Sequence, residues 1–173
     1  MKTKRGLLLC GAALLCAVVG LISGKHRSAP VAKMEKVLGL ELSSGCVVED
    51  QQEDHGVHGD GISFLVVEFQ DDAFLKQIES SADWYRLPVD NTLKTLFYGQ
   101  KWENEQQGPY LTGEDGMPLF PVVQNGYYWF RDRHPQLQLG EQRVAILQRP
   151  SFNFTAALYD SEARLLYFAE MDT

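Results

Sequence analysis

Alternating apolar and polar positions predict β-strands along much of the chain. The strongest runs are residues 62–69, rich in β-branched and aromatic side chains, and residues 152–159 and 164–171, which a short polar turn joins. Weaker strand patterns lie at 37–48, 119–123, 127–131 and 143–147. Gln124-Asn125-Gly126, between two of these, is typical of a hairpin turn. The sequence therefore predicts a largely antiparallel sheet.

Two segments instead carry apolar side chains at helical spacing. Residues 72–82 begin with acidic capping residues, and residues 91–98 lie between Asp90, a good N-cap, and Gly99, a stop signal. Residues 100–116 are polar and rich in turn formers, which predicts a surface loop. The sequence has no glycine-rich turn between a strand and a helix, which argues against a doubly wound nucleotide-binding fold. We expect an α+β fold: a mainly antiparallel sheet with two short helices packed on one side, preceded by one transmembrane helix.

The start of the chain has a different pattern, an uninterrupted apolar run over residues 6–24. These 19 residues carry no charge, and basic residues flank them on both sides: Lys2, Lys4, Arg5, Lys25 and Arg27. As a helix the run would be about 28 Å long, close to the thickness of the hydrocarbon core of a bilayer. The run therefore predicts a segment that crosses a membrane.

A cleavable signal peptide is the alternative interpretation of this run. Its basic start fits, but signal peptides have apolar stretches of about 7–15 residues. A cut after Gly24 would also place Ile22 where a small residue is preferred. Cys10 and Cys16 follow leucine pairs rather than small residues, so neither has the pattern of a lipidation site. The length favours an uncut anchor, and cleavage would make the protein secreted.

The sign of the net charge changes just after the apolar run. Residues 1–27 carry a formal charge of +5, whereas residues 28–173 carry −12. Because positive charges lie on both sides of the run, the long acidic segment decides the orientation, with its domain outside the cytoplasm. The expected parts are a cytoplasmic tip (1–5), a transmembrane anchor or signal peptide (6–24), a linker (25–33) and one extracytoplasmic α+β domain (34–173). An acidic domain without basic clusters argues against nucleic acid as a partner.

The clearest group of possible metal ligands lies in residues 54–60. His55 and His58, flanked by Asp54 and Asp60, have donor types that zinc or a similar divalent ion accepts. In a strand, however, the two imidazoles would point to opposite faces. The same side chains are ordinary polar turn formers at the tip of a hairpin. We therefore predict no bound metal and no cofactor.

Aromatic side chains gather in residues 127–130. Tyr127 and Trp129 would share one face of a strand, and Tyr128 and Phe130 the other, so one pair could stack on a sugar ring or a peptide. Further aromatics could extend such a platform: Trp84, Tyr85, Trp102 and Tyr110. Buried packing under the 100–116 loop is the simpler interpretation.

Candidates for nucleophilic catalysis are isolated. Asp132, His134 and Ser151 have the residue types of a catalytic triad, but no Gly-x-Ser-x-Gly turn surrounds a serine. Cys46 is the single cysteine after the apolar run, and its valine neighbours are typical of a small apolar residue in a strand. We predict no catalytic residue.

Four segments carry a resemblance to a known group of proteins: GDGISFLVVEF (59–69), GPYLTGEDGMPLFP (108–121), NGYYWFRDRH (125–134) and SFNFTAALYDSEARLLYFAEMDT (151–173). Over most of residues 37–173 the chain resembles an uncharacterised family of small membrane-tethered extracytoplasmic proteins of Gram-positive (Firmicutes-type) bacteria. The resemblance implies a bacterial surface location. It supplies no known activity and no catalytic or binding residue.

The anchor, the acidic domain and the isolated catalytic candidates lead to one functional expectation. We expect a binding or interaction module at the cell envelope that contacts an envelope protein or polymer and is not an enzyme. One alternative is a hydrolytic enzyme or a metal-dependent enzyme using His55, His58 and Asp60. The other is a carbohydrate-binding domain that uses surface aromatics around Trp129 to bind the cell wall.

Overall fold

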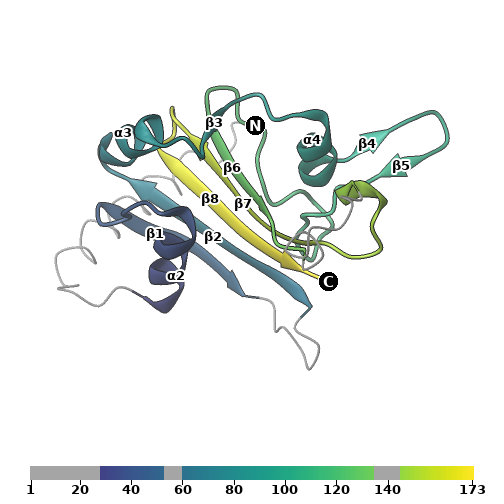
Figure 1. Cartoon of the computed structure of the whole chain (residues 1–173), viewed down its shortest axis with the longest axis horizontal. Coiled ribbons are helices and arrows are strands. Elements are labelled where there is room, and N and C mark those ends of the chain that lie inside the picture. The colour runs from purple at the N-terminus through teal and green to yellow at the C-terminus, as the bar shows by residue number, and fades with distance from the viewer. Residues whose placement is uncertain (1–27, 53–59, 135–144) are drawn as a thin grey trace, which may run out of the picture.

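The computed structural model describes residues 28–52, 60–134 and 145–173. Its helices are α2 (Ala29–Leu38), α3 (Ala73–Ser80), α4 (Asn91–Tyr98) and the short 3-10 turn η3 (Ile146–Gln148). Its strands are β1 (Gly45–Gln52), β2 (Gly61–Phe69), β3 (Tyr85–Arg86), β4 (Gln100–Lys101), β5 (Gln106–Gln107), β6 (Gly126–Asp132), β7 (Asn153–Asp160) and β8 (Leu165–Asp172). The described part of the chain has the predicted α+β class (Figure 1).

Six strands form one antiparallel sheet in the order β1-β2-β8-β7-β6-β3. Its centre is the hairpin of β7 and β8, in which Asn153 pairs with Asp172 and Asp160 pairs with Leu165. Strands β2 and β6 flank this hairpin, and β1 lies at one edge of the sheet (Figure 1). The strands predicted at 62–69, 127–131, 152–159 and 164–171 are confirmed as β2, β6, β7 and β8.

One face of the sheet, the α2/α3 face, is covered by the helices α2 and α3. Leu65, Ala157 and Phe168 of the sheet pack there with Met34 of α2 and Phe74 of α3, all of them buried. Aromatic stacking attaches α3 to β2, since the Phe74 ring of α3 stacks on the Phe69 ring of β2 with 4.4 Å between ring centroids.

The opposite face, the α4 face, is covered by α4 and the loop that follows it. Phe64, Ala156 and Ala169 pack there with Leu96 of α4 and Phe120 of the loop. The prediction that two helices pack on one side is therefore wrong, because α3 and α4 cover opposite faces. The reason lies in β7, where residues 154–159 are all buried, so both faces of the central strand need a cover.

A third helix, α2, begins inside the segment expected to be a linker. Pro30 stands in its first turn, and Gly39 ends it in the left-handed conformation with φ of +66°. Met34 and Leu38 are buried, so apolar packing stabilises the helix. As a result the strand expected at 37–48 begins only at Gly45, and it continues past its expected end to Gln52 as β1.

Two further strand predictions are wrong. Residues 119–123 form no helix or strand, and Pro118 and Pro121 around them lack the N–H groups that a strand would donate. In the described part of 143–147 the chain enters η3 instead of a strand. The expected loop at 100–116 contains the small hairpin of β4 and β5.

The predicted membrane segment at 6–24 lies outside the described residues. Within the described ranges, no helix has the length and apolar character needed to span a bilayer. The anchor therefore stays a prediction.

Strand β6 approaches β7 closely at Gly126, the first residue of β6, and a substitution there tests this close approach. A methyl group on Gly126 would overlap with the main-chain carbonyl oxygen of Tyr159 in β7, and neither backbone can move without breaking the pairing. We expect Gly126→Ala to lower the free energy of unfolding by about 3 kcal/mol, measured by urea denaturation. Gly39→Ala is the control, because that position has open space and only its left-handed backbone opposes a side chain, which costs about 1 kcal/mol. Equal losses in the two variants would contradict the tight approach of β6 to β7.

Candidate functional site

The candidate metal ligands of residues 54–60 lie mostly outside the described ranges. His55 and His58 lie outside them, and Asp60 is exposed immediately before β2. Among the described residues, no group of three or more His, Cys, Asp and Glu side chains could hold a metal ion. The prediction of no metal stays a prediction for the 54–60 segment.

The aromatic residues of β6 alternate as the sequence predicts, but both of their faces are covered. Tyr127 and Trp129 are buried on the α2/α3 face, whereas Tyr128 and Phe130 pack half-buried against the α4 face. Of the residues that could extend a platform, Trp84 packs on the α2/α3 face and Tyr110 on the α4 face. Tyr85 and Trp102 are exposed, and the centroids of the Tyr85 and Tyr128 rings lie 5.6 Å apart. The structure thus brings one aromatic pair together but divides the rest of the expected platform between the two faces.

Of the residues of the possible triad, Asp132 makes structural contacts, and no described hydrogen bond joins Ser151 to Asp132 or His134. The Asp132 carboxylate accepts two hydrogen bonds from the Arg149 guanidinium, at 3.0 Å and 2.8 Å, and one from the main-chain N–H of His134 at 3.1 Å. Burial alone would raise the pKa of the Asp132 carboxyl, but the Arg149 bonds and the His134 N–H together hold that pKa below its usual range. Asp132 thus fixes the segment before Phe152 to the end of β6 rather than orienting an imidazole for catalysis.

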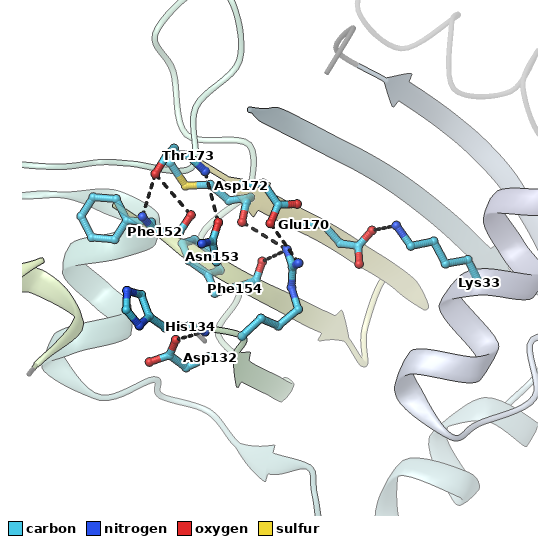
Figure 2. A network of polar contacts seen from close by, with 11 residues as sticks. Lys33, Asp132, His134, Phe152, Asn153, Phe154, Glu170, Asp172 and Thr173 are labelled. Carbon is cyan, nitrogen blue, oxygen red and sulfur yellow. Dashed lines mark hydrogen bonds and ion pairs between the residues drawn. The ribbon is translucent and has the colours of Figure 1, made fainter. Parts of the chain in front are cut away.

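Three polar contacts of Arg133 connect strands at the same end of the sheet, and their neighbourhood is drawn in Figure 2. Arg133 donates to the main-chain carbonyls of Phe154 and Met171, both at 3.2 Å, and pairs with the Asp172 carboxylate at 2.9 Å. This one guanidinium therefore connects the ends of β6, β7 and β8.

The ion pair of Lys33 with Glu170, labelled in Figure 2, attaches α2 to β8. The Glu170 side chain is 8% exposed, whereas that of Lys33 is 62% exposed. A buried carboxylate needs such a partner, because leaving it unpaired would cost several kcal/mol (about 3–5). The contact is a structural tether of α2, and no local sequence pattern predicts it, since the partners are 137 positions apart.

A groove on the α4 face could accept a ligand. Its volume is about 1030 Å³, and it opens between the edge strand β1 and the loop that contains residues 113–121. Phe64 of β2 and Tyr167 of β8 contribute to its apolar lining, together with Leu119 of the loop. Four acidic residues also line it: Glu49, Asp50, Glu114 and Asp115.

The two walls of the groove are fixed by hydrogen bonds. One wall, β1, is paired along its length with β2. In the other, the Gly116 N–H donates to the Gly113 carbonyl at 2.9 Å, and the Gly113 N–H donates to the Met117 carbonyl at 3.0 Å. The φ of +73° at Gly116 suits this tight turn, which holds Glu114 and Asp115 exposed beside the groove. The groove is therefore preformed.

The charged side chains among the described residues that line the groove are all acidic. The described residues that line it include no lysine or arginine beside the four carboxylates. In the apolar lining, burial raises the pKa of the Tyr167 hydroxyl, and the charges of Asp160, outside the lining, and of Glu49, within it, raise that pKa further. The described lining also contains no serine, threonine, cysteine or histidine, so it offers charge and shape rather than an activated nucleophile.

Sequence reasoning missed this groove. Its visible signals are two short acidic pairs, Glu49-Asp50 and Glu114-Asp115, which lie more than sixty positions apart. Each alone is a common feature of a strand end or a turn. Only the pairing of β1 with β2 and the path of the loop after α4 bring them to one groove.

No protein-family model, curated protein or solved structure shows significant similarity to this chain.

The contact of Asp132 with Arg149 predicts a defined acid dependence of stability. Because the pKa of Asp132 is lower in the folded chain than in the unfolded chain, the contact stabilises the fold above about pH 4. This stabilisation is lost as the pH falls through the folded-state pKa. We expect Asp132→Asn to cost about 1–3 kcal/mol at pH 7 and clearly less at pH 2.5, measured by urea denaturation.

Asp83→Asn is the matched control, because it removes the same charge from an exposed residue. We expect its effect to stay within about 0.5 kcal/mol at both pH values. If Asp132→Asn lowers the free energy of unfolding equally at pH 7 and pH 2.5, that result would contradict the role of the ionised carboxylate.

Proposed function

We propose that the chain is a membrane-anchored binding module of the cell envelope, whose acidic groove holds a positively charged segment of a partner. The groove carries this proposal, since it combines a preformed shape, an apolar lining and four carboxylates. Pockets that bind ligands have this combination of an apolar surface with a few convergent polar groups. A cationic ligand is the complement of that charge.

The charge of the whole domain supports the same ligand class. The formal charge of −12 on residues 28–173 would attract a cationic partner over a distance of about 10 Å at moderate ionic strength. The apolar run at 6–24 supports a location at the membrane, with the acidic domain outside the cytoplasm. Binding without catalysis is consistent with the absence of a nucleophile among the described residues that line the groove.

The ligand class can be tested with peptides of defined charge. We expect the full-length chain, in neutral detergent, to bind a fluorescent peptide of four Lys-Val repeats and not the matching Glu-Val peptide, as measured by anisotropy. The double variant Glu49→Lys with Glu114→Lys places two positive charges in the groove, so it should weaken this binding at least about tenfold. Raising the salt concentration should weaken wild-type binding as well.

The matched control is the double variant Glu103→Lys with Glu105→Lys. It makes the same change in net charge in the connection between β4 and β5, at exposed residues outside the groove lining. Binding by this control should stay within about twofold of wild type. An equal loss in both double variants would show that net charge alone attracts the peptide and would contradict the groove.

The location at the membrane has its own test. We expect the full-length chain to stay in the membrane pellet after extraction with alkaline carbonate, and deletion of residues 6–24 to release it. N-terminal sequencing of the mature protein distinguishes an uncut anchor from a cleaved signal peptide, which would begin at Lys25. An uncut chain in the soluble fraction would contradict the anchor.

A further inference from the structure

The edge strand β1 determines what kind of ligand the groove can take. In the sheet order, β1 pairs with β2 on its inner side, and no other described strand pairs with it on its outer side. The strand has eight residues, which corresponds to a length of about 27 Å. An edge of this length is a template to which an extended chain can add.

The groove extends over the α4 face from β8 and β2 to this edge. Three consecutive residues of β1 line it: Glu49, Asp50 and Gln51. Glu49 pairs with Val66 and Gln51 with Phe64, both on the α4 face, so these two side chains lie on the side of the groove. Asp50 pairs with Leu65 of the α2/α3 face, so it contributes to the lining where the groove meets β1 itself. A ligand in the groove therefore lies beside the main chain of β1.

A β-bulge in β1 turns two of these side chains toward the groove. Val47 pairs with Val67 of β2, and the next pair is Glu49 with Val66, so Val48 is an extra residue without an opposite partner in β2. Val67 packs on the α2/α3 face and Val66 on the α4 face. Without the bulge, Glu49 would follow Val47 on the α2/α3 face. Bulges of this kind re-aim side chains next to functional sites.

We propose that the ligand is an extended polypeptide segment that adds a strand to the outer edge of β1 and carries Lys or Arg at alternate positions. This inference rests on the proposed function and specifies its ligand. Main-chain hydrogen bonds to β1 supply affinity, and the groove supplies selectivity. Side chains of the added strand that point to the α4 face lie beside Glu49 and across from Glu114 and Asp115, so every second position favours a cation.

Peptides of equal length and charge separate strand addition from plain electrostatic attraction. The parent is the peptide of four Lys-Val repeats, and the composition control has four lysines followed by four valines. We expect the full-length chain to bind the alternating peptide at least about tenfold more tightly than the block peptide. Equal affinities would overturn strand addition and leave the acidic groove in place.

Main-chain methylation tests the same point without changing the protein. Two versions of the parent carry N-methyl groups on every second backbone nitrogen, one on the lysines and the other on the valines. Since alternate N–H groups of a strand point to the same edge, one version should lose binding at least about tenfold and the other should retain it. Equal retention or equal loss in both versions would overturn strand addition.

The remaining outcomes identify other occupants of the edge. Light scattering on the same samples reports whether two copies of the chain pair through β1, and a dimer that excludes the parent peptide would overturn the proposal. If the chain stays monomeric and none of the Lys-Val peptides binds to it, the result would instead contradict the proposed function itself. The results for the two proposals are therefore distinguishable.

Discussion

Burial of the central hairpin on both faces is the constraint on which the rest of the structure depends. In β7 the run from Phe154 to Tyr159 is buried without interruption, and β8 is buried from Phe168 to Met171. Such strands cannot leave one face in water, so the chain must supply two separate covers. Helices α2 and α3 provide one, and α4 with its following loop provides the other. The groove exists because the second cover is partly a loop, which leaves space beside β1.

Much of the sheet could be predicted from local sequence. The strands β2, β6, β7 and β8 have clear apolar patterns, and α4 has a cap that the structure confirms, since the Asp90 carboxylate accepts a hydrogen bond from the Leu93 N–H at 2.9 Å. The placement of the helices was predicted wrongly, although the sequence held a warning. The run Phe154–Tyr159 is nearly continuous in apolar and small residues, which is typical of a strand buried on both faces rather than one.

Helix α2 and the groove show two different limits of sequence reasoning. Helix α2 has local signals, Pro30 at its start and Gly39 at its end, but its position directly after the apolar run suggested a linker. The groove has no such signals. It depends on a single extra residue, Val48, and on a loop from another part of the chain, and neither can be derived from periodicity.

The acidic character of β1 also affects how copies of the protein behave toward each other. An exposed strand edge is the usual starting point for sheet-to-sheet aggregation, and proteins commonly protect it with charges and bulges. In β1 the carboxylates of Glu49 and Asp50 stand beside the bulge at Val48, so two such edges would bring like charges together. The same residues that favour a cationic strand therefore disfavour self-association. In the proposed location at a membrane surface, where tethering would hold many copies at high local concentration, this repulsion would keep the edges open for the proposed strand of a partner.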